Sequence, residues 1–353
     1  MTSVIDAIAP SRVAIVCGAG GVGKTTVSAS LGVALARRGC NVCVLTVDPA
    51  RRLAGALGID TASDSPVEVA GDWDGSLHAV QLHASSTFDA LIERHAASEE
   101  QAHAIRRNPL YRSLATALGG TQEYMAMERL YELNATDAYD IVVVDTPPTR
   151  NALELLDAPE RLLRFLGNRV VRTMLAPTRI GLRAASAATS TVLKGISSVV
   201  GGDLVDDAVE FLHAFAGMQQ GFADRAASVQ RLLVDPATAY VLVTTPSVDG
   251  MEEVAWFASH LLERGVTPAA AVINRCQPSF FDGDPEGLPV ATGILGIHLD
   301  ALREVERSAR HDAALVAGTG DLFGGAPVAV VPLATAPSRD IDRLGVVADH
   351  LEA

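Results

Sequence analysis

The feature that most constrains the fold is a repeated alternation of short apolar runs with longer helical patterns. One run, Ile141–Val144, contains only β-branched residues, which is typical of a strand buried on both faces of a parallel sheet. The predicted strands are Arg12–Cys17, Val42–Val47, Leu77–Leu82, Asp140–Val144, Ala239–Thr244, Ala269–Ile273 and Pro327–Val331. The helical patterns are Lys24–Arg38, Phe88–Ala97, Gln122–Asn134, Asp203–Leu233, Met251–Arg264 and Arg339–Leu351. This order predicts an α/β fold with a doubly wound, mostly parallel sheet.

The spacing of the strands predicts a helical insertion. The connection that follows Val144 is far longer than an ordinary crossover helix. No internal repeat or low-complexity linker divides the chain. We therefore expect one domain over residues 1–353, with helical subdomain elements at 85–135 and 155–235 inserted in it.

Composition excludes several classes of protein. Hydrophobic residues make up 48% and charged residues 20% of the chain, so a large core can form. Four cysteines are too few for a disulfide-stapled secreted scaffold and suit a reducing compartment. The start of the chain does not resemble a signal peptide, and no apolar run is long enough to span a membrane. The net charge of −14 disfavours nucleic acid as a partner. These features predict a cytoplasmic protein.

One segment reverses the acidic character of the chain. Residues 161–200 carry seven positive charges and no acidic residue, interleaved with apolar side chains. A basic, apolar helical segment of this kind can contact a membrane peripherally or bind a hydrophobic partner. The alternative is a core-packed helical subdomain whose arginines pair with the acidic residues of 203–207.

The first predicted strand leads into a phosphate-binding pattern. Gly18, Gly23, Lys24 and Thr25 satisfy the Walker A spacing, with a strand before the loop and a helix after it. Glycines allow successive backbone N–H groups to converge on a phosphate, and the helix N-terminus adds a positive dipole end. Lys24 would reach the β- and γ-phosphates, and the Thr25 hydroxyl would ligate Mg²⁺. The predicted phosphate-binding residues are Gly20, Gly21, Val22, Gly23, Lys24, Thr25 and Thr26.

Two aspartates follow strands that should end beside this loop. Asp48 comes after Val42–Val47, and Asp145 comes after Ile141–Val144. Ligands gather at the carboxyl ends of parallel strands, so both carboxylates should face the phosphates. Asp145 is the predicted Walker B residue that holds Mg²⁺ through water. Asp48 is the candidate to orient or deprotonate the attacking water.

Taken together, these motifs resemble the deviant Walker A ATPases of the arsenite-pump and tail-anchored-protein-targeting family. The matching stretches are GAGGVGKTT at 18–26, DPA at 48–50, DTPPT at 145–149, VTTP at 243–246, Asn274 in VINR, and Pro332-Leu333. The resemblance implies a single P-loop ATPase domain that binds ATP and Mg²⁺ and works as a dimer. It also implies that Asn274 reads adenine, that Pro332 and Leu333 help bind the nucleotide, and that the helical insertion binds a hydrophobic client or membrane protein.

The sequence departs from the family pattern at the position of Ala19. The family usually has a lysine there, which contacts the nucleotide of the partner subunit. One hypothesis is that Arg150 or Arg51 supplies the missing positive charge, because a guanidinium suits phosphate well. The other is that the chain forms a heterodimer with a paralogue that retains the lysine, as bacterial members do, rather than a homodimer.

Three functions are compatible with these residues. The first is a Mg²⁺-dependent dimeric ATPase whose nucleotide state gates a hydrophobic client- or membrane-partner-binding helical surface. The second is an ATP-binding regulatory subunit of a heterodimer. The third is an ATPase that drives an anion or arsenite transporter, although residues 44–275 lack the cysteines that direct arsenite binding requires.

Overall fold

The computed structural model describes residues 2–47, 52–59, 65–108, 111, 121–168, 211, 214–215, 217–319, 322–333 and 340–353. The chain divides into two compact units. Unit 1 comprises Met1–Gln81, Leu133–Ala152 and Val234–Ala353, and unit 2 comprises Leu82–Glu132 and Leu153–Leu233.

Unit 1 is built on an eight-stranded sheet in the order β3-β4-β2-β5-β1-β6-β7-β8. The strands are β1 (Val13–Gly18), β2 (Asn41–Thr46), β3 (Val67–Glu68), β4 (Ser76–Gln81), β5 (Ile141–Asp145), β6 (Thr238–Thr244), β7 (Ala270–Cys276) and β8 (Val328–Pro332). All neighbours are parallel except β3 and β4. The predicted α/β fold with a mostly parallel sheet is therefore confirmed.

Each predicted apolar run lies in a strand, with small differences at the ends. The strand β7 continues to Cys276, three residues beyond the predicted end. The two-residue strand β3 was not predicted, because it pairs antiparallel to β4 at the sheet edge and carries no buried apolar run.

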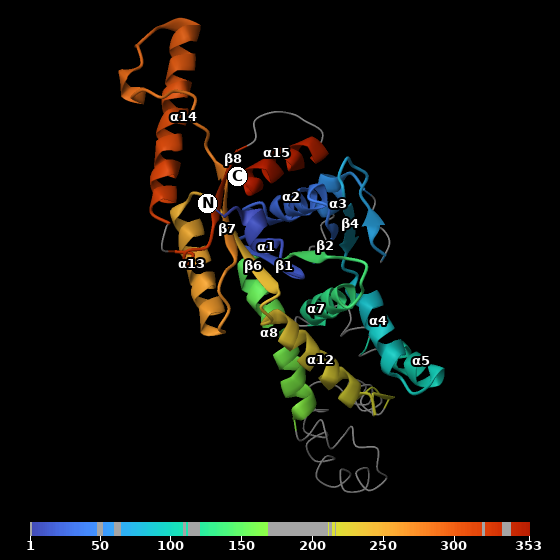
Figure 1. The fold of residues 1–353 in the computed structure, drawn as a ribbon. Helices are drawn as coiled ribbons and strands as arrows, with labels where there is room; N and C mark the ends of the chain where they lie inside the picture. The colour runs from blue at the N-terminus through green and yellow to red at the C-terminus, as the bar shows by residue number, and fades with distance from the viewer. Residues whose placement is uncertain are drawn as a thin grey trace. The chain divides into compact units, whose positions relative to one another are not determined.

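Helices cover both faces of this sheet (Figure 1). The helices of unit 1 are α1 (Val4–Ile8), α2 (Lys24–Arg37), α3 (Arg52–Leu57), α13 (Val248–Glu263), α14 (Gly293–Ala317) and α15 (Asp340–Glu352), with a 3₁₀ turn η1 (Pro285–Gly287). The strand residues Ala14 and Val16 pack with α2 and α15 in one buried cluster, whereas α13 contacts β6 and β1 from the other side.

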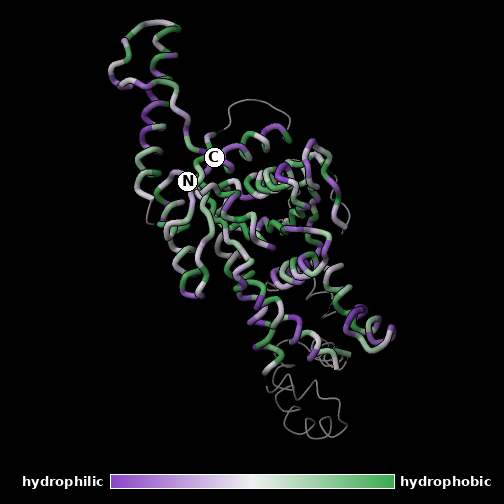
Figure 2. The backbone as a smooth tube through the Cα atoms, in the orientation of Figure 1, coloured by the Kyte–Doolittle hydropathy of each residue, from purple (hydrophilic) through white to green (hydrophobic). Residues whose placement is uncertain are grey.

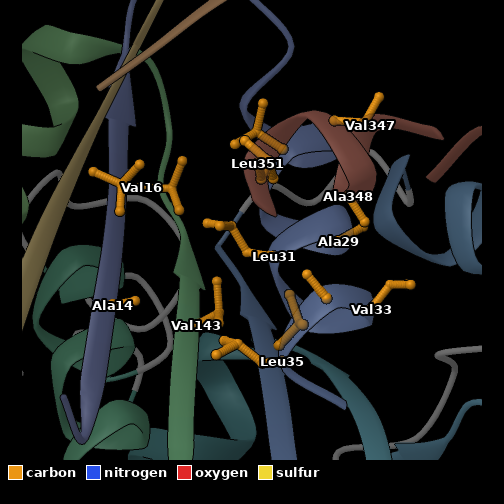
Figure 3. Close-up of a cluster of buried hydrophobic side chains, with 14 of the residues drawn as sticks. Ala14, Val16, Ala29, Leu31, Val33, Leu35, Val143, Val347, Ala348 and Leu351 are labelled. Carbon is orange, nitrogen blue, oxygen red and sulfur yellow. The ribbon is translucent and has the colours of Figure 1, made fainter. Parts of the chain in front are cut away.

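A hydrophobic core of unit 1 lies between the sheet and the helices α2 and α15 (Figure 3). Leu31 and Leu35 of α2 are fully buried against strand residues such as Val143, and Leu351 of α15 closes the cluster. Residue hydropathy agrees with this position of the core, since the residues of the central strands and of α2 are mostly apolar (Figure 2). Because α2 packs between the sheet and α15, the loop that precedes α2 is anchored to the hydrophobic core.

Unit 2 is helical. It contains α4 (Ala84–His95), α5 (Glu99–Arg107), α12 (Gln219–Leu233), most of α7 (Thr121–Asn134) and α8 (Thr149–Gly167) from Leu153 onward. Aromatic rings of Phe211, Phe215 and Phe222 pack together, with ring centroids 4.8 and 5.7 Å apart for the adjacent pairs.

The helices of the structure differ from the predicted helical patterns in two ways. The pattern at Asp203–Leu233 does not form one helix, because α12 begins only at Gln219. Gly217 has φ 90°, a left-handed conformation that interrupts a helix. Residues 203–210 lie outside the described part of the chain. In addition, the predicted helical patterns did not include α1, α3, α5, α8 and α14, although α5 and most of α8 fall within the helical elements expected at 85–135 and 155–235.

Candidate functional site

The Walker A loop joins β1 to α2, as its sequence context predicts. Gly23 is the residue before the first turn of α2, with φ 95°, a conformation that strongly favours glycine. A Cβ atom at this position would also lie 2.3 Å from the side-chain nitrogen of Asn274. Both the backbone angle and the close neighbour therefore require glycine here.

Lys24 bends back over the loop that precedes it. Its Nζ donates hydrogen bonds to the carbonyl oxygens of Gly18 at 2.9 Å and Ala19 at 2.8 Å. The side chain is buried, so the ammonium is held within the loop rather than in solvent. This places a positive charge against the backbone of the glycine-rich loop.

The carboxyl ends of β1, β2 and β5 meet beside Thr25. Pairing sets Asp145 opposite both Val16 and Thr46. Asp145 is almost completely buried, and its Oδ2 accepts hydrogen bonds from the Thr25 hydroxyl at 2.8 Å and the Thr46 hydroxyl at 3.0 Å. The structure thus brings together Lys24, Thr25 and Asp145 at one end of the sheet.

These oxygen atoms fit a magnesium ion. Mg²⁺ prefers hard oxygen ligands and is commonly held by one or two protein groups together with substrate phosphates and water. The Thr25 hydroxyl and the Asp145 carboxylate supply such a pair. No cluster of three or more His, Cys, Asp or Glu side chains occurs within the described residues, so an all-protein metal cage is not found there.

Asn274 and its neighbour approach the phosphate loop from β7. Asn274 is buried, and its Nδ2 donates to the Val22 carbonyl oxygen at 2.8 Å. Arg275 donates from Nη1 to the Gly21 carbonyl oxygen at 3.0 Å. Asn274 was predicted from the sequence as a site residue, whereas Arg275 was not. The strand pattern contains no signal for Arg275, because its position depends on a local backbone irregularity.

Pro332 and Leu333 lie at the end of the neighbouring strand. Pro332 pairs with Cys276, and the Leu333 N–H donates to the Cys276 carbonyl oxygen at 2.8 Å. The Leu333 side chain is partly exposed. Both residues therefore lie next to the segment that carries Asn274.

Several predicted residues fall outside what the structure describes. Asp48 and Arg51 belong to residues 48–51, and most of the basic segment belongs to 169–200. The backbone of Arg150 lies in the first turn of α8, but its side chain is not described. In the described part of the basic segment, Arg164 forms an exposed ion pair with Glu160 at 3.6 Å.

All four cysteines lie within the described residues, and none of them forms a disulfide. Cys17, Cys43 and Cys276 are buried, and Cys40 is half-buried. Burial raises the pKa of the Cys17 thiol to about 12, although the nearby charge of Lys24 acts in the opposite direction. Cys17 is therefore a neutral core residue, as its position in a strand indicates.

Comparison with known proteins identifies the family. The sequence model of the anion-transporting ATPases matches residues 11–284, which is most of the chain. The chain belongs to the anion-transporting ATPase family. The match contains the Walker A loop, both aspartates and Asn274, and it ends before α14.

Individual relatives of this ATPase family member agree with the assignment. An uncharacterized protein of Streptomyces coelicolor is 31% identical over 76% of this chain, and the match covers 63% of that protein. The ATPase GET3 of Malassezia globosa is 35% identical over 43% of this chain and 44% of its own length. The ATPase GET3A of Arabidopsis thaliana is 27% identical over 76% of this chain and 67% of its own length. The chain thus spans less than two thirds of the first two relatives.

None of the helices in the described ranges combines the length and the apolar character needed to cross a membrane.

Proposed function

We propose that this chain binds ATP with Mg²⁺ and hydrolyses it. The observation that carries the proposal is the convergence of Lys24, Thr25 and Asp145, with the Thr25 hydroxyl 2.8 Å from the Asp145 carboxylate. A lysine over a glycine loop, a helix N-terminus and a magnesium-type oxygen pair are the parts that phosphoryl transfer needs. Family membership supports the same activity.

In this proposal, different residues contact the phosphates, Mg²⁺, the attacking water and the base. The backbone N–H groups of Gly20–Thr26 bind the phosphates, and Lys24 stabilises the charge on the transferred phosphoryl group. Thr25 and Asp145 hold Mg²⁺, which neutralises phosphate oxygens when bound. Asp48 orients and deprotonates the attacking water. Asn274, Pro332 and Leu333 contact the base, and Arg150 contributes a charge to the phosphates.

We further propose that nucleotide state gates a hydrophobic surface. Residues 1–353 act as one P-loop ATPase domain in the cytoplasm, and the helical elements at 85–135 and 155–235 bind a client or membrane-protein partner. The exposed Phe165 in the described part of the basic segment supports an apolar contact there. The ATP-bound dimer displays this surface and hydrolysis removes it.

A second candidate is an ATP-binding regulatory subunit. Ala19 stands where the family usually has a lysine, and its carbonyl oxygen accepts a hydrogen bond from Lys24 while its side chain offers no charge. In this form the chain pairs with a lysine-bearing paralogue.

Steady-state ATP hydrolysis by the purified chain tests the proposal, with Asp48→Asn as the paired variant. We expect magnesium-dependent turnover that falls at least about a hundredfold in the variant, because the base for water is lost. Tight ATP binding without turnover by the chain alone favours the regulatory subunit. Absence of nucleotide binding contradicts both candidates.

A further inference from the structure

The strand β7 has an irregular end beside the phosphate loop. Arg275 has φ 63° and is the one non-glycine residue with a positive φ in the ranges that the structure describes. The register between β7 and β8 shifts at the same place, between Ile273 and Cys276. A left-handed conformation is unfavourable for a residue with a Cβ, and such strain is concentrated at functional sites.

This irregularity brings two consecutive side chains to the same target. In a regular strand, neighbouring residues point to opposite faces of the sheet. Here Asn274 donates to the Val22 carbonyl oxygen at 2.8 Å, and Arg275 donates to the Gly21 carbonyl oxygen at 3.0 Å. The Arg275 N–H also donates to Asn274 Oδ1 at 2.9 Å, which fixes the orientation of the asparagine amide. The left-handed turn therefore builds a two-residue clamp on consecutive loop carbonyls.

The clamp determines where two loop N–H groups point. In a trans peptide, the C=O and N–H of one unit point in opposite directions. The Gly21 carbonyl shares its peptide unit with the Val22 N–H, and the Val22 carbonyl shares its unit with the Gly23 N–H. When the carbonyls are held by β7, both N–H groups point away from β7. Converging N–H groups of this kind are what a phosphate needs.

We propose that Arg275 is a positioning residue for the phosphate loop, which presets the Val22 and Gly23 N–H groups before the nucleotide arrives. The ligand is the phosphate chain of a nucleoside di- or triphosphate. The inference rests on the proposed nucleotide-binding function and adds a residue to it. Preorganisation of this type increases affinity by lowering the ordering cost of binding.

Stability alone does not explain an arginine here. Its side chain is exposed, and exposed polar contacts contribute little to folding. Glycine or asparagine tolerates a left-handed backbone better than arginine does. Replacing Arg275 with either residue should therefore relieve strain while it removes the guanidinium.

The test compares Arg275→Gly, Arg275→Asn and Arg275→Lys with the wild type. The Kd values for ADP and for ATP are measured by competition with a fluorescent ADP analogue, and the melting temperature is measured without nucleotide. We expect the Gly and Asn variants to melt at or above the wild-type temperature and to bind both nucleotides about tenfold more weakly. Lysine keeps one donor and should recover part of the affinity. Because Arg275 orients the loop for nucleotide binding and does not act in the chemical step, kcat should stay within about twofold while KM rises.

Arg264→Asn is the matched control. Arg264 is also an exposed arginine that donates to a carbonyl, that of His260 at 3.1 Å, but it lies before the opposite end of β7. This variant should leave both Kd values unchanged. Wild-type affinity in Arg275→Gly and Arg275→Asn overturns the inference, and so does a fall in melting temperature that accounts for the lost binding.

The experiments distinguish failure of the proposed ATPase activity from failure of the proposed role of Arg275. If the wild type binds ADP and ATP but does not hydrolyse ATP, the proposed activity fails, and the Kd comparison still decides the role of Arg275. If the wild type binds neither nucleotide, both proposals are overturned.

Discussion

At the scale of single residues, the buried carboxylate of Asp145 is the group on which magnesium dependence should rest. It accepts hydrogen bonds from Thr25 and Thr46 and is almost fully enclosed. Asp145→Asn keeps the shape but removes the charge that attracts the ion. We expect ADP binding without magnesium to stay near wild type, while turnover at saturating magnesium falls at least about a hundredfold.

A magnesium titration of ATP hydrolysis checks this expectation. Thr46→Val is the companion variant, because it removes one hydrogen bond to Asp145 and leaves the carboxylate in place. It should raise the magnesium concentration needed for half-maximal turnover by less than about tenfold. Normal turnover in Asp145→Asn would remove the residue from the site.

Sequence spacing was sufficient to predict the site residues whose neighbours are set by the motif. Gly23, Lys24 and Thr25 follow β1 at fixed offsets, and Asp145 ends a strand that pairs with β1. Arg275 was not predictable, because its role depends on a left-handed backbone angle and a register shift. Neither property has a sequence signature at a non-glycine residue.

At the scale of elements, the helices α4, α7 and α12 of unit 2 meet at a buried carboxylate. Glu128 is fully buried, and its Oε1 accepts hydrogen bonds from Arg225 Nε at 2.7 Å and Arg94 Nη1 at 3.3 Å. Burial raises the pKa of Glu128, and the charge of Arg225 is the strongest opposing influence. The like charge of Glu132 also raises the pKa of Glu128. The Glu128 carboxylate in turn contributes to the raised pKa of Tyr124.

Removal of Arg225 should therefore destabilise unit 2 in a pH-dependent way. Arg225→Ala leaves an uncompensated buried charge, which we expect to lower the free energy of unfolding by about 3 kcal/mol at pH 8. With a pKa raised in the folded state, Glu128 binds a proton more readily when folded. Stability therefore falls as pH rises through that pKa, and the loss in the variant should shrink toward pH 5.

Denaturant unfolding followed at pH 5 and pH 8 measures this difference. Arg94→Ala is the control, because the Arg94 side chain is 45% exposed and its contact with Glu128, at 3.3 Å, is longer than the 2.7 Å contact of Arg225. The loss should be about 1 kcal/mol or less. Adding Glu128→Gln to Arg225→Ala should restore part of the stability at pH 8. Equal losses at both pH values would show that Glu128 does not titrate between pH 5 and pH 8, which contradicts the expected pH dependence.

The helix α14 was missed by sequence patterns because it buries few apolar residues. In α14 the buried residues are only Gly296, Glu306 and Ala309. The helix is attached to the preceding segment by polar contacts instead, since Arg303 donates to the carbonyl oxygens of Pro285 and Leu288. Hydrophobic periodicity cannot reveal such a helix. The central strands β1, β5 and β6 were predictable for the opposite reason, because both of their faces are buried.

At the scale of the whole molecule, the proposed nucleotide site and the proposed client surface belong to different units. The Walker A loop, Asp145, Asn274 and Pro332 all lie in unit 1, whereas α4, α5 and α12 lie in unit 2. A ligand at a free concentration of about one hundred times its Kd stabilises the unit that binds it by about 2.7 kcal/mol. Any effect on unit 2 requires coupling between the units.

Hydrogen exchange measured with two different nucleotides tests whether the two units are coupled. Both Mg²⁺–ADP and a non-hydrolysable ATP analogue should increase protection in β1, α2, β5 and the end of β7, because both ligands contain the phosphates that the loop binds. Gating by the γ-phosphate predicts that the analogue alone changes exchange in α4, α5 and α12, since a ligand shifts an equilibrium only through its differential affinity. The Arg225→Ala variant should lower protection in these helices with either nucleotide, which calibrates the signal. If unit 2 exchanges identically in both complexes, ATP binding and client binding are not coupled, and the chain functions as an ATPase without the proposed gate.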